Sequence, residues 1–289
     1  MCRWKTWSSN ARSKLRPETP SAATAPAAAA AGAEPRPALP AFAELNVPAE
    51  WRRLDFLSDL HLSPDTPATL AALAAHLQDS SAEAIFLLGD IFEVWIGDDA
   101  RHQDFEASCV ELLHAASQRH TLFFMAGNRD FLVGPDMLAA CGMQALADPT
   151  VLNAFGQRWL LSHGDALCMD DKPYQAFRAQ ARSAAWQAQF LARPLEERRA
   201  LARQMREASQ AGQAEMSVYA DLDSAACVQW LQASGCSDLI HGHTHRPARH
   251  ELAPGLRRHV LSDWDFEGAK PRGDLLRLRH AGLRRIDLA

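Results

Sequence analysis

Five short, mostly apolar segments, each followed at once by a cluster of Asp, His, Asn and Gly residues, constrain the fold of this 289-residue chain most strongly. They cover residues 53–57, 84–88, 122–125, 159–162 and 239–240. Apolar strands separated by stretches with helical spacing, such as 67–78 and 105–119, are typical of an α/β core whose strands are buried on both faces. Ligands gather at the carboxyl ends of such strands, where each cluster lies. The pattern therefore predicts that clusters remote in sequence meet at one site.

Two later regions depart from this rhythm. Residues 174–233 carry little strand signal and are rich in Ala, Arg, Gln and Leu, which predicts a helical cap inserted over the site. Residues 274–279 and 283–288 flank Ala281 and Gly282, and they predict a β-hairpin.

The first 46 residues have the composition of a tail. Residues 18–41 form a low-complexity Ala/Pro run, and the basic stretch before it lacks the apolar core of a signal peptide. A disordered tail at 1–46, or a start codon assigned too far upstream, is favoured over a transit peptide. We predict a single domain at 47–289.

Composition limits the class of partner. The net charge of −5 argues against binding to nucleic acid. The chain contains no run of 18 apolar residues, so the sequence predicts no membrane span. The six cysteines show neither a pairing pattern nor zinc-type spacing, which favours reduced thiols in a cytosolic protein.

The clusters contain seven side chains with nitrogen or oxygen donors: Asp59, His61, Asp90, Asn128, His163, His243 and His245. Any one of them alone is more often a turn former or a buried polar group, but turns do not require four histidines. Imidazole and carboxylate donors without thiolate suit Mn, Fe or Zn. Two divalent ions facing two aspartates would keep about two units of positive charge, which favours an anionic phosphoryl substrate.

The motifs D-x-H, G-D, G-N-R-D, H-G-D and G-H-T-H occur in this order, with W-I-G-D-D at 95–99 and D-D-K-P-Y-Q-A-F-R at 170–178. From residue 53 onward the chain resembles the calcineurin-like metallophosphoesterases, and among them the bacterial UDP-2,3-diacylglucosamine diphosphatases of lipid A synthesis. The resemblance implies an α/β fold, a β-sandwich flanked by helices with a helical cap. It also implies release of UMP and 2,3-diacylglucosamine 1-phosphate.

The resemblance further implies a role for each donor. Asp59, His61 and His245 would bind one manganese ion, and Asn128, His163 and His243 the other. Asp90 would bridge both ions and hold the bridging hydroxide that attacks the α-phosphorus of the substrate.

Substrate contacts are implied in the same way. Asn128, Arg129 and His243 would contact the diphosphate, whereas Asp171 and Ser209 would contact the acylated glucosamine. The family often has an Asn and then a Lys after this serine, but here Gln213 lies nearby and Met216 stands where the lysine is expected. We assign Gln213 to the substrate site. The implied location is the inner face of the cytoplasmic membrane, with no nucleic acid and no obligate protein partner.

Several alternatives stay open. The arginines at 198, 199, 203 and 206 either face anionic lipid or form a solvated helix face with Glu196 and Glu197. The apolar cap residues either line a slot for acyl chains or pack the cap itself; they are Trp186, Phe190, Leu191, Leu195, Leu201 and Met205. Another phosphodiesterase, nucleotidase, nucleotide pyrophosphatase or protein phosphatase is the main alternative function. A non-catalytic scaffold is disfavoured because all seven donors are present.

Overall fold

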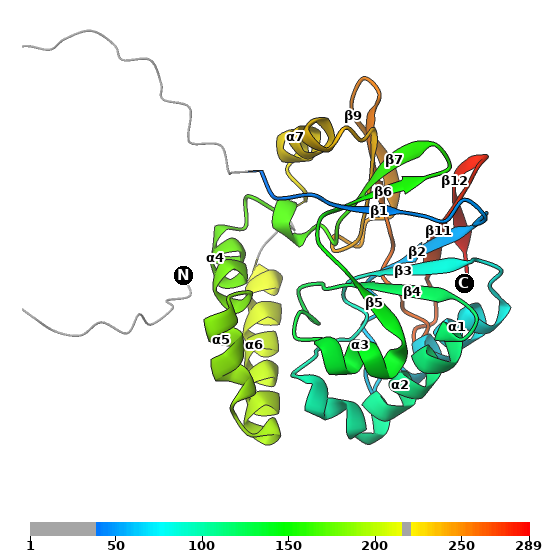
Figure 1. Cartoon of the computed structure of the whole chain (residues 1–289). Coiled ribbons are helices and arrows are strands. Elements are labelled where there is room, and N and C mark those ends of the chain that lie inside the picture. Colours follow the sequence, from blue (N-terminus) through cyan, green and yellow to red (C-terminus); the bar gives the residue numbers. More distant parts are fainter. Residues whose placement is uncertain (1–38, 216–220) are drawn as a thin grey trace, which may run out of the picture. The chain divides into compact units, whose positions relative to one another are not determined.

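Two six-stranded sheets form the centre of the structure, a computed structural model that describes residues 39–215 and 221–289, without the side chains of 206–215 (Figure 1). The first sheet has the order β1 (Ala43–Asn46), β6 (Thr150–Ala154), β7 (Gln157–Leu161), β8 (Asp238–His241), β10 (Leu256–Val260) and β9 (Ala248–Ala253). The second has the order β12 (Gly282–Asp287), β11 (Asp274–Arg279), β2 (Leu54–Leu57), β3 (Ala84–Leu88), β4 (Thr121–Met125) and β5 (Met143–Leu146).

The strands that precede the five polar clusters run parallel within their sheets. β2, β3 and β4 are parallel neighbours in the second sheet, and β7 and β8 are parallel neighbours in the first. In each sheet the loops that follow these strands therefore leave at the same edge, and this arrangement places their polar side chains together.

The core between the sheets consists of alternate residues of each strand, because successive side chains of a strand point to opposite faces. Phe56, Phe86 and Phe123 stack across three neighbouring strands, with ring centroids 4.9 and 4.7 Å apart. They pack against Leu161 and Ile240 of the first sheet. Full burial of such a side chain contributes about 1.5–3 kcal/mol, so this layer is a principal source of stability.

Helices cover the two outer faces, as Figure 1 shows. Ile85, Leu87 and Phe124 of the second sheet pack in one apolar cluster with helices α1 (Pro67–Asp79), α2 (Asp104–Ser117) and α3 (Pro135–Cys141). Leu160 and Leu239 of the first sheet share a cluster with α7 (Ser224–Ser234). The predicted α/β sandwich flanked by helices is thus confirmed.

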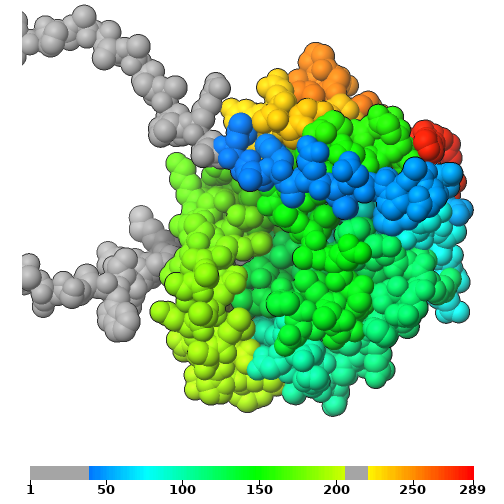
Figure 2. Space-filling view, viewed as in Figure 1, coloured from blue at the N-terminus to red at the C-terminus, as the bar shows by residue number. Residues whose placement is uncertain are grey.

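The cap consists of three helices, α4 (Lys172–Ala181), α5 (Ala184–Leu191) and α6 (Leu195–Glu215). They lie along one side of the sandwich (Figure 2). The first two begin at side chains that accept a hydrogen bond from a free backbone N–H: Asp171 from Tyr174 and Ser183 from Trp186. The predicted extension of the cap to residue 233 is wrong, because α7 packs on the first sheet through buried Cys227 and Leu231.

The W-I-G-D-D segment joins the cap to the core. The guanidinium of Arg198 on α6 is buried, pairs with the Asp99 carboxylate and donates to the Ile96 carbonyl at 2.5 Å. Asp98 accepts from the backbone N–H groups of Gly134 and Met137, both at 2.9 Å. Arg198 is therefore not available to a lipid surface, whereas Arg199 pairs with Glu196 on an exposed helix face.

The predicted boundary of the tail at residue 46 is also wrong. Residues 43–46 form β1, which pairs in parallel with β6, and the ring of Phe42 meets that of Trp230 edge-on at 6.2 Å. The compact unit starts at Pro40. The composition of this region does not predict β1, because the strand is defined by its hydrogen bonds to β6 and not by its own residues. Residues 1–38 lie outside the described part of the chain.

Two further expectations concern membranes and thiols. Among the described residues, no helix is both long and apolar enough to cross a bilayer. The cysteines at positions 109, 141, 168, 227 and 236 are all free thiols and buried.

Candidate functional site

The loops after five strands of the two sheets deliver the seven predicted donors. Asp59 and His61 follow β2, Asp90 follows β3 and Asn128 follows β4, whereas His163 follows β7 and both His243 and His245 follow β8. Three loops thus come from the second sheet and two from the first, so the site lies where the two sheets meet.

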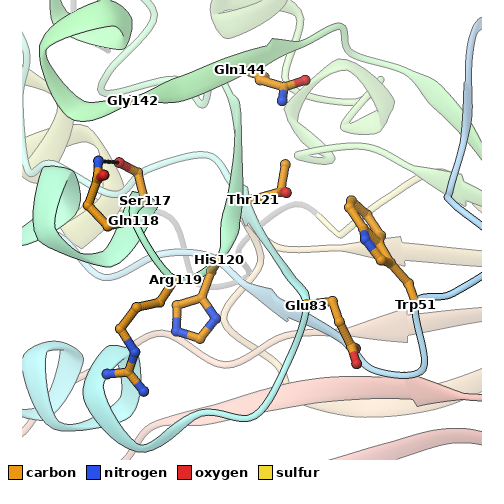
Figure 3. A pocket seen from close by; sticks show the side chains of 9 residues that line it. All are labelled: Trp51, Glu83, Ser117, Gln118, Arg119, His120, Thr121, Gly142 and Gln144. Carbon is orange, nitrogen blue, oxygen red and sulfur yellow. Dashed lines mark hydrogen bonds between the residues drawn. The ribbon is translucent and has the colours of Figure 1, made fainter.

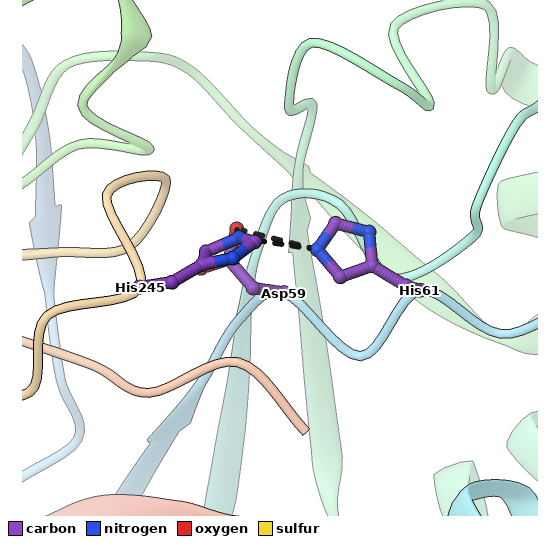
Figure 4. Close-up of side chains that lie close together, drawn as sticks. All are labelled: Asp59, His61 and His245. Carbon is purple, nitrogen blue, oxygen red and sulfur yellow. Dashed lines mark hydrogen bonds and ion pairs between the residues drawn. The ribbon is translucent and has the colours of Figure 1, made fainter. Parts of the chain in front are cut away.

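Asp59, His61 and His245 form the first group of donors (Figure 4), and one donor atom of each lies within 4.8 Å of the others. His245 Nε2 is 3.2 Å from Asp59 Oδ1 and also 3.2 Å from His61 Nε2. Two imidazole nitrogens this close require a proton or a cation between their lone pairs. The group therefore has the composition and spacing of a cation site.

Asp90, His163 and His243 form the second group, again within 4.8 Å of one another. Asn128 completes it, because its Oδ1 lies 3.0 Å from His163 Nε2 and 2.8 Å from His243 Nδ1. His163 Nδ1 is 2.9 Å from the Leu88 carbonyl, which can only accept a hydrogen bond. In a neutral His163 the proton is thus on Nδ1, and the Nε2 lone pair points into the group, as in metal-binding histidines.

The backbone is strained at most of these residues. Of the six described non-glycine residues with positive φ, five are predicted donors: Asp59 (55°), His61 (51°), Asp90 (54°), His243 (68°) and His245 (53°). A non-glycine residue in this region costs on the order of 1 kcal/mol or more, and such strain concentrates at functional sites. It aims the side chains of D-x-H and G-H-T-H at the same point.

Two glycines of the motifs allow the loops to approach closely. A Cβ atom on Gly242 would overlap Ser58 Oγ and Asp59 Oδ2, and one on Gly127 would overlap the Asp90 carboxylate and backbone. The motifs therefore need glycine at these positions because no other residue leaves room for the neighbouring loop.

The site is electronegative without a bound cation. Burial disfavours the imidazolium of His163, but the carboxylates of Asp90, Asp59 and Asp165 outweigh this effect and raise the pKa of His163 to about 9. Burial opposes the Asp59 carboxylate, yet His245, His163 and His61 hold the pKa of Asp59 well below its usual range. Divalent cations suit a site of this charge.

Carboxylates behind the donors orient them. Glu93 Oε2 lies 3.3 Å from His61 Nδ1, and Asp263 Oδ2 lies 3.7 Å from His245 Nδ1. Asp130 accepts from the backbone N–H groups of Gly127 and Ile91, both at 2.7 Å, and so joins two ligand loops. Burial, together with the Asp90 carboxylate, raises the pKa of Asp130 to about 6.

None of these three carboxylates has a role predicted from the sequence. Asp130 is the last residue of the G-N-R-D motif and Glu93 lies three residues after Asp90, so the motifs themselves were the available signal. Asp263 lies outside every motif, and only the folded chain brings it to His245.

Arg129 lies at the rim of the site, with about a third of its side chain exposed. Its backbone N–H donates to Asp90 Oδ1 at 2.8 Å, and its guanidinium pairs with Glu93 and lies 3.6 Å from Asp90 Oδ2. The guanidinium thus lies beside Asp90 of the second donor group and beside Glu93, whose carboxylate approaches His61 of the first.

The other predicted substrate residues lie on the cap. The Asp171 carboxylate caps α4 by accepting from Tyr174 N at 3.0 Å. Ser209 and Gln213 are on α6, but their side chains lie outside the described part, so their assigned roles stay predictions.

The apolar side chains of the cap divide into a packed set and an exposed set. Trp186 stacks on buried Phe190, with ring centroids 5.0 Å apart, and packs with Leu195 and Leu201 against the main core. Leu191 and Met205 are 40% and 39% exposed, and Val94, in the loop before the W-I-G-D-D segment's Trp95, is 47% exposed. The first set stabilises the cap, and the second leaves an apolar surface.

A depression of about 460 Å³ lies elsewhere, beside the amino-terminal ends of β3 and β4 (Figure 3). Its lining includes Trp51, Glu83, Arg119, His120 and Gln144. None of the seven donors lines it, so the grouping of donors, not this depression, defines the candidate site.

A family model described as calcineurin-like phosphoesterase matches residues 52–247. The chain is 45% identical over 232 residues to UDP-2,3-diacylglucosamine hydrolase of Xanthomonas axonopodis pv. citri, an alignment that covers 76% of this chain and 94% of that protein. It is 45% identical over 240 residues to the protein of the same name from Bordetella pertussis, with 80% and 93% covered. The Stenotrophomonas maltophilia protein of that name is 42% identical, with 76% and 94% covered.

Proposed function

The chain belongs to the calcineurin-like phosphoesterase family, and we propose that it hydrolyses UDP-2,3-diacylglucosamine to UMP and 2,3-diacylglucosamine 1-phosphate, a step of lipid A synthesis. The observation that carries this proposal is the pair of Asp/His groups that meet at the junction of the sheets, with Arg129 at their rim. The names of relatives that match most of the chain support the choice of substrate.

Two divalent ions would supply Lewis acidity and lower the pKa of a water molecule that attacks phosphorus. Asp59, His61 and His245 would hold one ion, and Asn128, His163 and His243 the other, with Asp90 shared between them. We propose Mn²⁺ for both positions, because imidazole, carboxylate and amide donors without thiolate suit this ion.

Arg129 would bind the diphosphate. Its guanidinium can donate two parallel hydrogen bonds to phosphoryl oxygens, and Glu93 and Asp90 hold it in place. With Asn128 and His243, it would orient the α-phosphorus toward the metal centre. The bond from this phosphorus to the bridging oxygen would break, so that 2,3-diacylglucosamine 1-phosphate leaves and UMP keeps the attacked phosphorus.

The cap would bind the acylated end of the substrate and face the membrane. Leu191 and Met205 on the cap and Val94 before the W-I-G-D-D segment are exposed and would provide apolar surface for acyl chains. The proposed location is the inner face of the cytoplasmic membrane, where a substrate with two acyl chains resides. Asp171, Ser209 and Gln213 are proposed to contact its glucosamine.

A comparison of substrates tests the proposal. The protein with Mn²⁺ is expected to release UMP from UDP-2,3-diacylglucosamine far faster than from UDP-N-acetylglucosamine, which has the same diphosphate but no acyl chains of this kind. Efficient cleavage of a simple phosphodiester, with no action on the glycolipid, would favour another phosphoesterase of the family instead.

A further inference from the structure

One face of α4, continued by its C-cap residue Arg182, carries three side chains that converge on a single buried carboxylate oxygen. Tyr174, Arg178 and Arg182 are spaced by four residues and therefore lie on the same side of the helix. Tyr174 Oη donates to Asp165 Oδ2 at 2.5 Å, and Arg178 Nε donates to the same oxygen at 2.8 Å. Arg182 Nη2 lies 3.5 Å from it. We call these three residues the cap anchor.

The cap anchor contacts three of the four loops of the second donor group, those of Asn128, His163 and His243. Asp165 is two residues after His163, in the short 3-10 helix Asp165–Leu167. Arg182 Nη2 donates to the carbonyl of Gly127, the residue before Asn128, at 2.8 Å. The Tyr174 ring lies 6.2 Å from the His243 ring at an interplanar angle of 30°.

The described contacts of the cap anchor do not extend to the first donor group. Within the described residues, no hydrogen bond, ion pair or ring contact joins the cap anchor to Asp59, His61 or His245. The cap anchor therefore supports the second half of the metal centre and not the first.

The charges of the cap anchor explain why it is sensitive to substitution. Asp165 is fully buried, and the Asp148 side chain, which is 7% exposed, lies 4.0 Å from Arg178. Two arginines thus balance two buried carboxylates. Removal of one arginine leaves a buried carboxylate without its full set of partners, which strongly disfavours the docked arrangement.

We propose that Tyr174, Arg178 and Arg182 are positioning residues that hold Asn128, His163 and His243 in place, and that docking of the cap and metal binding by this second group are linked. Linkage is reciprocal, so the docked cap raises metal affinity by the same factor by which the bound metal favours docking. The inference rests on one part of the proposed function, the binding of divalent ions at this site. It does not depend on which substrate is cleaved.

Titration of metal-free protein with Mn²⁺, followed by calorimetry, tests the positioning role. Wild type should show two binding events. In Arg182→Gln one of them should weaken by about 10- to 100-fold, as for other residues that orient metal ligands, while the other stays unchanged. Equal affinities in wild type and variant, or equal weakening of both events, would overturn the proposal.

Arg199→Gln is the matched control, because Arg199 is also a cap arginine but pairs with Glu196 on its own helix. It should bind Mn²⁺ as wild type does. Tyr174→Phe is a milder test variant, since it removes one hydrogen bond to Asp165 and keeps the ring over His243; it should weaken the same event in the same direction.

Hydrogen exchange tests the reciprocal effect in the wild-type protein, independently of any variant and of the glycolipid. Backbone amides of residues 174–181 should exchange more slowly with Mn²⁺ bound than in metal-free protein, and Arg182→Gln should reduce this difference. Identical exchange of these amides with and without Mn²⁺ in wild type contradicts the linkage. Failure of this test alone would leave the proposed hydrolysis intact, whereas failure of glycolipid turnover alone would leave the linkage intact.

Discussion

Asp59 Oδ1 and His245 Nε2 are 3.2 Å apart, although 186 residues separate them in the chain. Asp59 follows β2 of one sheet, and His245 follows β8 of the other. Their contact exists only because the two sheets pack face to face through the Phe56, Phe86 and Phe123 layer. The metal centre is thus a property of the whole sandwich.

Asp90→Ala is expected to reduce turnover by more than about 100-fold, a larger loss than is typical for residues behind the ligands. Asp90 is the donor proposed to be shared by both ions, and its Oδ1 also accepts from Arg129 N. Steady-state kinetics at saturating Mn²⁺ measures the effect, with circular dichroism as the check on folding. A folded Asp90→Ala protein that keeps more than a tenth of wild-type turnover would remove the shared role of Asp90.

Gly242→Ala should impair both stability and metal binding. The added methyl group would overlap Ser58 Oγ and Asp59 Oδ2, and overpacking of this kind costs about 1–3 kcal/mol in the free energy of unfolding. Denaturant unfolding measures the loss. Gly268→Ala is the control, since the nearest atom to its new methyl group is 3.7 Å away; it should change stability by less than about 0.5 kcal/mol. Equal effects of the two substitutions would contradict the close-approach argument.

Acid should weaken the fold partly through Asp55. Burial raises the pKa of this carboxyl, but hydrogen bonds from Arg277 (2.6 Å) and Ser80 (2.8 Å), with His76 Nε2 3.4 Å away, outweigh it and hold the pKa at about 2, below the ordinary 3.8. A lowered pKa in the folded state stabilises the protein above pH ~4, and this contribution of about 2 kcal/mol is lost as the pH falls from about 4 to about 2.

Urea unfolding at several pH values between 6 and 2.5 checks this account. Asp55→Asn should be less stable than wild type at pH 6, and the difference should shrink toward low pH. Asp65→Asn, at an exposed position, should follow the wild-type pH dependence. A difference between wild type and Asp55→Asn that is independent of pH would rule out Asp55 as a source of the acid sensitivity.

Truncation should distinguish the tail from β1. Deletion of residues 1–38 is expected to leave turnover and melting temperature unchanged. Deletion of residues 1–47 also removes β1 and the Phe42 contact to Trp230, so it should lower the melting temperature. The two truncated proteins can be compared by thermal unfolding. Identical melting temperatures would show that β1 contributes nothing to the stability of the first sheet.

The elements that the sequence predicted well are those with a wholly apolar pattern. β3 was predicted at 84–88 and lies there. In the hairpin, β11 has its predicted bounds, and β12 begins and ends one residue earlier than predicted. The missed elements β1, β5, β6 and β9 are short or partly polar strands, and β9 alternates exposed and half-buried residues such as Arg249 and His250. Partner strands, rather than local composition, determine such elements.

The sequence predicted those residues of the candidate site that lie in recognisable motifs. All seven donors lie in motifs, and the structure brings them into two groups, whereas the orienting carboxylate Asp263 lies in no motif. The sandwich followed from the resemblance and not from the apolar pattern, which is equally compatible with one sheet between two layers of helices. The division of the site between the two sheets was not predicted. At Arg198 the local pattern is misleading. The spacing of charged residues fits a solvated helix face, but the Arg198 side chain is buried against Asp99.

Hydrolysis of UDP-2,3-diacylglucosamine in ¹⁸O-labelled water, by metal-free protein with and without added Mn²⁺, tests the central claim most directly. We predict that turnover requires Mn²⁺ and that mass spectrometry finds the label in UMP, because attack on the α-phosphorus adds the water oxygen to that phosphate. Label in 2,3-diacylglucosamine 1-phosphate would contradict attack on the α-phosphorus, and full turnover by metal-free protein would contradict the metal centre itself.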